Sequence, residues 1–385
     1  MSVKDRSKET IFVQIASYRD VELPRTIQSA LDNATHPERL RFGLCWQYDE
    51  YTLTDLDDYL TDARFRISQV HFEQSLGCCW ARNQTNLLYR DETYTLQIDA
   101  HTRFIEGWDV QYIDMLCAID AEKPLLTTYP PPFNMINDVE EQREPRNIQR
   151  LVLNRMDRNL TTIFKTVDVP DGNPPEASQF LAAGQIFTLG IFCREVEYDP
   201  NMYYSGEEIS LSARAYTHGY DMFCPNKHLI WHLYRHKMPT HWGDHQVTRH
   251  DGAIARLEKL LTGNHEELGR YGLGSQRSLK EYEAFSGLDF IGRQNKPMTP
   301  TLFQQTITYN PDCFESRNDY HFWIFTLRNE DDEEIYRRDI FDHHVLQMTD
   351  CRIHVDEKLQ DKPVSYMLWP KTWDDGFLPQ QFFDL

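Results

Sequence analysis

The stretch Thr93-Tyr-Thr-Leu-Gln-Ile-Asp-Ala-His101 carries the clearest indication of the fold. Its β-branched and apolar first part predicts a buried strand over residues 93–98, and Asp99 and His101 follow directly. In an extended chain, residues two positions apart point to the same side, so both side chains can reach one cation. Open α/β sheets bind their ligands at the carboxyl ends of their strands. The stretch therefore predicts a ligand site at the end of a strand in such a sheet.

Short apolar runs of the same kind precede and follow this strand and alternate with helical patterns. This alternation is typical of βα units around a mostly parallel sheet, so we expect an α/β fold with a Rossmann-like sheet flanked by helices. The three prolines at 130–132 end the last strand, and the polar residues up to Asn147 predict a surface loop. The predicted strands cover 11–17, 41–48, 65–72 and 124–129, and the predicted helices cover 25–34, 53–60, 78–90 and 107–120.

Later in the chain the pattern changes from helices to strands. Gly206-Glu-Glu208 has the acidic first turn of a helix that ends at Gly219, and two more helices are predicted over 252–262 and 276–285. Beyond Asn295, alternating aromatic-rich runs indicate a small antiparallel β module. We therefore expect two domains, which cover residues 1–294 and 295–385.

The composition limits the possible partners. The 385 residues are 40% hydrophobic, which is enough to bury a sizeable core. Sixty acidic and forty basic residues leave a net charge of −20, which repels nucleic acids and anionic membranes. The first ten residues are charged, no later stretch has the ~20 apolar residues of a spanning helix, and the eight cysteines contain no Cys-x-x-Cys pair. We therefore expect a cytoplasmic protein without an integral membrane segment and without a nucleic-acid partner.

Two histidine-containing patterns suggest a metal site. Asp99 and His101 offer a carboxylate and an imidazole, which suit manganese or a similar divalent ion better than calcium. The alternative is a zinc hydrolase that uses a cluster of His228, His232 and His236, whose spacing of four residues would align them on a helix. Residues 229–234 are β-branched and aromatic, however, and therefore favour a short strand.

Two further segments permit a functional and a structural interpretation. Glu207 and Glu208 follow Tyr203-Tyr-Ser205, and carboxylates beside aromatic rings fit a sugar site as well as a plain helix start. Gly77-Cys-Cys-Trp-Ala-Arg82 can begin a helix, or its backbone amides and Arg82 can bind a phosphate. Neither segment decides the function alone.

Taken together, the motifs resemble the GlcNAc-transferase domain family, whose eukaryotic members attach N-acetylglucosamine to hydroxyproline in the cytoplasm. The resemblance covers roughly residues 10 to 290 and implies a fold of the GT-A type, similar to that of the polypeptide GalNAc-transferases. The segments that carry it are Ile15–Asp20, Gly77–Arg82, Leu96–His101, Trp108–Asp109, Thr127–Pro130, Ser205–Glu208, Trp231–Arg235 and Arg270–Gly274.

This resemblance implies a role for individual residues. Asp99, His101 and His232 correspond to the metal ligands, and Glu207 and Glu208 lie where the sugar meets the acceptor. Asp99 is thereby implied in catalysis together with Glu207 and Glu208. The residues implied in binding the nucleotide-sugar are Ser17, Tyr18, Asp20, Gly77, Arg82, Tyr204, Trp231 and Arg235.

The implied activity is a retaining, manganese-dependent transfer of GlcNAc from a UDP-sugar to a hydroxyl group. Same-face attack, with the donor phosphate as proton acceptor, is favoured over a covalent intermediate. The sequence leaves the acceptor open, and hydroxyproline on a protein, a saccharide chain and a lipid-linked glycan are all compatible with it. A contrasting hypothesis is an inactive carbohydrate- or protein-binding module on a transferase scaffold, with the β module as its working part.

Overall fold

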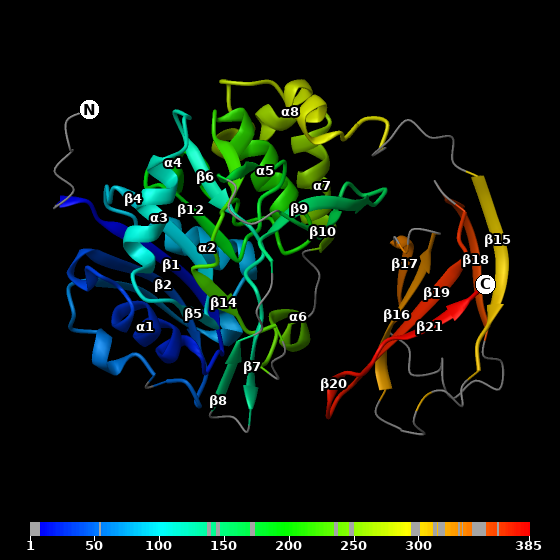
Figure 1. Cartoon of the computed structure of the whole chain (residues 1–385), viewed down its shortest axis with the longest axis horizontal. Coiled ribbons are helices and arrows are strands. Elements are labelled where there is room, and N and C mark those ends of the chain that lie inside the picture. Colours follow the sequence, from blue (N-terminus) through cyan, green and yellow to red (C-terminus); the bar gives the residue numbers. More distant parts are fainter. Residues whose placement is uncertain are drawn as a thin grey trace. The chain divides into compact units, whose positions relative to one another are not determined.

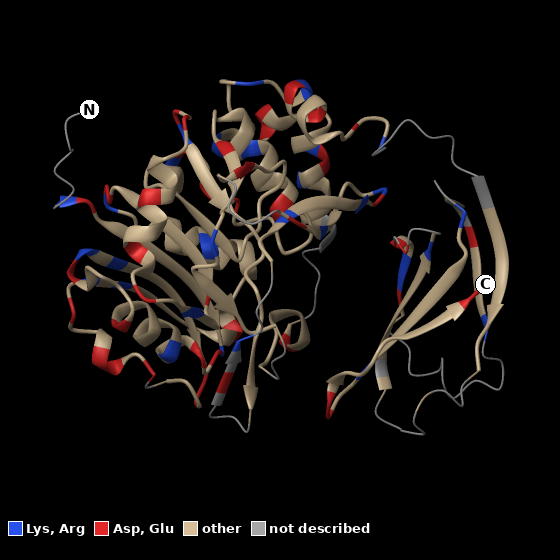
Figure 2. Cartoon of the chain, in the orientation of Figure 1, with Lys and Arg blue, Asp and Glu red and all other residues tan. Residues whose placement is uncertain are grey.

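The chain divides into two compact units, Met1–Asn295 and Lys296–Leu385, and each unit is described by itself (Figure 1). Acidic side chains are spread over many elements of both units (Figure 2). None of the described helices is long and apolar enough to cross a membrane. The structure is a computed structural model that describes residues 8–53, 55–136, 140–143, 147–169, 174–234, 238–245, 250–293, 301–310, 314, 320–329, 332, 334–340, 352–359 and 362–385.

An eight-stranded mixed sheet forms the centre of the first unit, in the order β11-β13-β6-β12-β4-β1-β2-β3. The neighbours β3, β2, β1 and β4 run parallel, whereas β12 runs antiparallel to both β4 and β6. The α/β fold with a Rossmann-like mixed sheet is thus confirmed. The strands are β1 Ile11–Tyr18, β2 Leu40–Tyr48, β3 Phe65–His71, β4 Tyr94–Asp99, β6 Pro124–Thr127, β11 Glu176–Ala177, β12 Gln185–Leu189 and β13 Asp221–Cys224.

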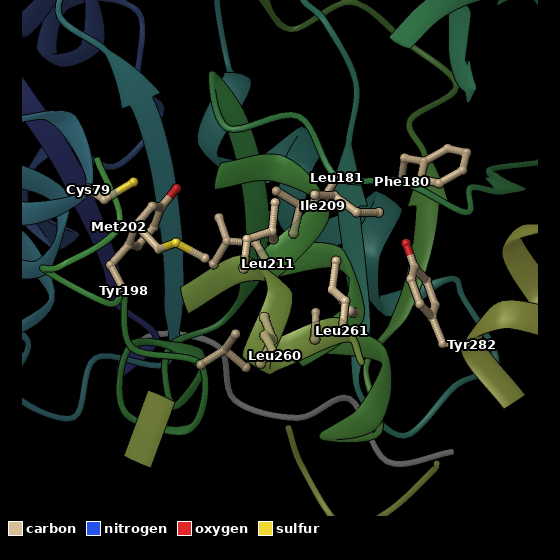
Figure 3. Packing of buried hydrophobic residues seen from close by; sticks show 14 of the residues in the cluster. Cys79, Phe180, Leu181, Tyr198, Met202, Ile209, Leu211, Leu260, Leu261 and Tyr282 are labelled. Carbon is tan, nitrogen blue, oxygen red and sulfur yellow. The ribbon is translucent and has the colours of Figure 1, made fainter. Parts of the chain in front are cut away.

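Helices cover both faces of this sheet because its strands are apolar on both sides (Figure 1). In β12, Ile186 belongs to one core cluster and the adjacent Phe187 to the other. One cluster joins the sheet to α1 and α3, and the second joins it to α2, α5, α7 and α8 (Figure 3). The helices are α1 Leu23–Asp32, α2 Cys78–Asn86, α3 Trp108–Cys117, α4 Phe192–Glu195, α5 Glu207–Thr217, α6 His241–Asp244, α7 His250–Leu261 and α8 Leu279–Ser286.

The helix expected over 53–60 is wrong. Within the described residues of this range, the chain forms only a 3-10 turn, Asp57–Tyr59, with Leu56 buried and Leu53 and Leu60 exposed. The Asp49 carboxylate accepts hydrogen bonds from the backbone amides of residues 51 and 52, and these bonds favour a turn. A single buried leucine cannot hold a helix against the sheet.

The loop expected after the three prolines contains a hairpin, β7 Phe133–Ile136 with β8 Glu140–Arg143. Phe133 is fully buried, and the Arg103 guanidinium lies 4.9 Å from its ring centre. Arg103 also pairs with Glu141. These contacts fix a hairpin in which the polar strand β8 pairs with β7.

Shorter strand pairs complete the first unit. The ribbon of β5 Thr102–Phe104 and β14 Ile230–His232 is antiparallel and lies outside the main sheet. A second hairpin consists of β9 Gln149–Met156 and β10 Thr162–Asp168. The strand β14 is the short strand expected within residues 229–234, so this expectation is confirmed.

The second unit is built from antiparallel strands, as expected for residues beyond Asn295. Alternating residues of β16 and β19, among them Trp323, Phe325 and Leu368, form its core. Its strands are β15 Thr301–Thr308, β16 Tyr320–Arg328, β17 Glu334–Ile340, β18 Arg352–Leu359, β19 Ser365–Thr372, β20 Gly376–Phe377 and β21 Gln381–Asp384.

Candidate active site

Asp99, His101 and His232 come together at the carboxyl end of β4. Asp99 is the last residue of β4, His101 follows it, and the ribbon pairs His232 with Thr102. One possible ligand atom of each residue lies within 4.8 Å of the other two. Among the described residues, no other group of three His, Cys, Asp or Glu side chains meets this criterion. The chain thus gathers one carboxylate and two imidazoles at the place where α/β sheets bind ligands.

The donor groups of this cluster fit a divalent cation. His232 Nε2 lies 3.0 Å from Asp99 Oδ2, and the rings of His101 and His232 are 4.5 Å apart. His232 Nδ1 is buried and has no hydrogen-bond partner within the described part of the chain. A mixed carboxylate and imidazole set suits manganese and similar ions.

Asp20 orients one of these imidazoles. Its Oδ2 lies 2.7 Å from His101 Nδ1, and its Oδ1 accepts a hydrogen bond from the Glu22 amide. Carboxylates in this position fix the tautomer and the orientation of histidine ligands. Asp20 was expected to bind the nucleotide, and the structure places it beside the cluster of Asp99, His101 and His232.

Arg82 connects Asp99 to the acidic start of α5. Its Nη2 donates to Asp99 Oδ1 at 2.6 Å, and its Nε lies 3.0 Å from Glu207 Oε1. Its Nη1 donates to the carbonyl of Ala183. Burial acts to raise the pKa of Asp99, but Arg82 and the hydrogen bond from His232 outweigh it and hold the pKa well below its usual value. Arg82 was expected beside the diphosphate, whereas its buried guanidinium is directed at two carboxylates.

Glu207 and Glu208 have different surroundings at the start of α5. Glu207 is buried, and burial raises the pKa of its carboxyl although Arg82 opposes this. Glu208 accepts hydrogen bonds from the Ala183 amide at 3.0 Å and from the Tyr129 hydroxyl at 2.7 Å. Burial raises the pKa of Glu208 to about 7. Near neutral pH, Glu208 can therefore both accept and donate a hydrogen bond.

The end of β1 forms a second polar cluster. Tyr18 OH and Arg19 Nη1 each lie 2.8 Å from Asp244 Oδ2, and Arg19 Nε donates to Asp49. Ser17 is buried at the same strand end. Tyr18 and Ser17 were expected near the nucleotide, whereas Arg19, Asp49 and Asp244 were missed. Arg19 lies inside the Ile15–Asp20 motif, but nothing in the local sequence connects that motif to Asp244.

The remaining residues that were expected to bind the nucleotide-sugar lie in different surroundings. Gly77 has a φ of +110°, and a side chain there would meet the Tyr203 ring at 2.7 Å, so only glycine fits. Trp231 alternates with His232 along β14 and thus points away from Asp99 and His101. Tyr204 is 53% exposed and precedes the acidic pair. Arg235 lies outside the described residues.

The histidine cluster of the zinc hypothesis is not supported by the described part of the chain. His232 lies in a strand rather than a helix, and it groups with Asp99 and His101. His228 Nε2 contacts the Asn147 carbonyl at 3.0 Å and does not belong to that group. His236 lies outside the described residues. The spacing of four residues therefore does not place His228 and His232 on one helical face.

Residues 10–59 and 49–292 match the family model described as Glycosyltransferase (GlcNAc). The chain belongs to this family. It is accordingly a glycosyltransferase, and the resemblance noted from its motifs is confirmed. No curated protein matches the chain.

The chain is also similar to solved structures, one of which supports this assignment at the level of the fold. The GT-A enzyme GalNAc-T7, solved with UDP, GalNAc and Mn²⁺, is 14% identical with a TM-score of 0.55, and the match covers 97% of this chain and 69% of that chain. TarS residues 1–349 of S. aureus, solved with UDP-GlcNAc, are 12% identical with a TM-score of 0.47 and coverages of 74% and 72%. The GT-A type of the α/β fold is thus confirmed by GalNAc-T7.

Proposed function

We propose that the protein transfers GlcNAc from UDP-GlcNAc to a hydroxyl group, with retention of configuration and with a manganese ion at Asp99, His101 and His232. The observation that carries this proposal is the convergence of these three side chains beside Glu207 and Glu208. Membership of the GlcNAc family supports the donor sugar. GalNAc-T7, with its UDP and Mn²⁺, supports the nucleotide and the metal.

In this proposal the chain's own residues prepare the donor site. A divalent ion, when bound, supplies positive charge that neutralises the leaving diphosphate of an otherwise acidic protein. Arg82 keeps Asp99 ionised for that purpose, and Asp20 keeps His101 oriented. Ser17 and Tyr18 at the end of β1 are proposed for the base and ribose, and Gly77 for the diphosphate side, where α2 begins.

The protein contacts of Glu207 and Glu208 favour same-face attack over a covalent intermediate. Glu207 is paired with Arg82, and both oxygens of Glu208 accept hydrogen bonds from protein groups. Both carboxylates are thus engaged by protein groups, which favours a positioning role over that of a covalent nucleophile. We therefore propose that Glu208 holds a hydroxyl of the sugar or the acceptor, and that the donor phosphate accepts the proton.

A donor screen tests this function. Purified protein is incubated with a panel of UDP-sugars, with and without manganese, and UDP release to water is measured. The expected result is manganese-dependent release that is fastest with UDP-GlcNAc. Calorimetry that detects no manganese-dependent UDP binding would instead support the inactive binding module. Tight zinc binding that survives loss of Asp99 would support the hydrolase.

Gly184 provides a prediction that is specific to the metal cluster. A Cβ at this position would lie 2.9 Å from Asp99 Oδ2, so Gly184→Ala should displace that carboxylate. We expect manganese affinity to fall about tenfold, the size of effect known for residues that orient metal ligands. Gly252→Ala, where a Cβ meets nothing within 4 Å, is the matched control. Equal manganese affinity in the two variants, measured by titration, would remove Asp99 from the ligand set.

The second unit is proposed as an accessory domain of the transferase. It has its own core and is compact by itself. We also propose that the protein is cytoplasmic and that the second unit influences which acceptor is used.

A further inference from the structure

Exposed aromatic side chains of the first unit lie mainly on the segments that form the candidate active site. The described part of the first unit has four such residues. Three of them lie on these segments, namely Tyr204, Tyr234 and Trp242, which are 53%, 46% and 51% exposed. Tyr234 follows the metal-cluster residue His232, and their rings are 4.2 Å apart. Tyr204 lies just before the acidic start of α5. Apolar rings left half exposed beside a catalytic centre indicate a ligand that covers them.

Tyr204 and Trp242 form a pair. Their ring centres are 5.1 Å apart and their planes are inclined by 50°. The amide of Glu207 donates to the Tyr204 carbonyl at 3.2 Å, which ties this ring to the start of α5. The pair therefore lies beside the carboxylates that are proposed to handle the sugar.

The short helix α6, which carries Trp242, is anchored on both sides of that residue. His241 Nδ1 lies 2.6 Å from the Tyr203 hydroxyl, and Asp244 accepts hydrogen bonds from Tyr18 and Arg19. Tyr203 precedes Tyr204, so neighbouring residues hold both members of the pair. The pair of Tyr204 and Trp242, called the platform below, is therefore fixed before binding. It loses little conformational entropy when a ligand stacks on it.

We propose that Tyr204 and Trp242 stack on a pyranose ring of the acceptor, and that the acceptor is therefore a saccharide. This inference rests on the proposed function and adds the substrate class. The C–H faces of a sugar ring pack on aromatic rings, and its hydroxyls match carboxylate acceptors such as Glu208 and Asp244. The platform and these carboxylates together provide the apolar surface and the hydrogen-bond acceptors that a saccharide requires.

The backbone near the site favours a saccharide over an extended peptide. Peptides commonly bind by adding a strand to an open edge. The β14 segment beside the platform is already paired, because the His232 amide donates to the Pro131 carbonyl and the Leu233 amide donates to the His101 carbonyl. At these described positions the backbone is not open to an added strand, so side chains must recognise the ligand.

The test compares acceptors and variants of the full-length protein. UDP release from UDP-GlcNAc is measured with tetrasaccharides of glucose, galactose and N-acetylglucosamine, and with a synthetic hydroxyproline-containing peptide. We expect a saccharide to accelerate UDP release above the rate with water. Trp242→Ala should raise the KM for that saccharide by about tenfold, more than it raises the KM for UDP-GlcNAc, as loss of a central aromatic contact does. Trp242→Phe should restore most of the affinity.

Leu87→Ala is the control, since Leu87 is an apolar side chain that is 59% exposed and lies in the first unit, at the end of α2 opposite Gly77. This variant should leave both KM values unchanged. An unchanged acceptor KM in Trp242→Ala, or acceleration by the peptide and by none of the saccharides, would overturn the inference. Wild-type protein that does not hydrolyse UDP-GlcNAc at all would overturn the proposed function instead, so the two failures are distinguishable.

Discussion

Asp99→Asn is expected to lower kcat/KM for sugar transfer by about 1000-fold, which corresponds to about 4 kcal/mol of transition-state stabilisation. The amide has the shape of the carboxylate but not its charge, so it is a poor ligand for a divalent ion. It also leaves Arg82 facing a neutral group at 2.6 Å. UDP release and manganese binding, both measured on the folded variant, check this prediction.

Asp120→Asn serves as the control, because Asp120 is exposed in the loop between α3 and β6. It should retain wild-type turnover and wild-type manganese affinity. If Asp99→Asn retained manganese-dependent turnover, Asp99 would not belong to the metal site, and the proposed function would lose the observation that carries it.

Arg82→Met is expected to cost about 3 kcal/mol of unfolding free energy, because it leaves Asp99 and the buried Glu207 without their shared countercharge. We also expect turnover to fall about 100-fold, since Arg82 positions both carboxylates. Chemical denaturation and UDP release, at a temperature where the variant is folded, measure the two effects.

Arg256→Met is matched to this variant. Arg256 makes two bonds to the Asp199 carboxylate, which is as buried as Glu207. Its loss should reduce stability by a comparable amount while turnover of the folded protein stays within about twofold. Equal losses of turnover in the two variants would show that Arg82 acts through stability alone.

The strands near the site could be predicted because their signals are local. The run over 93–98 alternates apolar residues with Thr and Gln, as a strand does, and the two-residue spacing of Asp99 and His101 determines their common side. The wrong helix at 53–60 has apolar residues at helical spacing, but tertiary contacts bury only one of them. The β7–β8 hairpin depends on Arg103, which lies far away in the sequence and could not be inferred.

Residues of the site were predictable to different degrees. His232 was indicated only by the family resemblance, since its approach to Asp99 depends on the β5–β14 ribbon. Gly184 was missed, and Tyr129 was given no role although it lies in the Thr127–Pro130 motif, because their contacts with Asp99 and Glu208 join distant segments. No pattern in the local sequence distinguishes such residues from ordinary core positions.

The β5–β14 ribbon has a consequence for how the protein holds together. His232 contacts a residue 133 positions earlier in the chain, and its strand lies outside the eight-stranded sheet. An ion shared by Asp99, His101 and His232 would therefore act as a reversible cross-link that closes a long loop, much as a disulfide does. Loading the metal and ordering this part of the chain would then be one coupled equilibrium, so cation supply would control the enzyme's resistance to local opening as well as its chemistry.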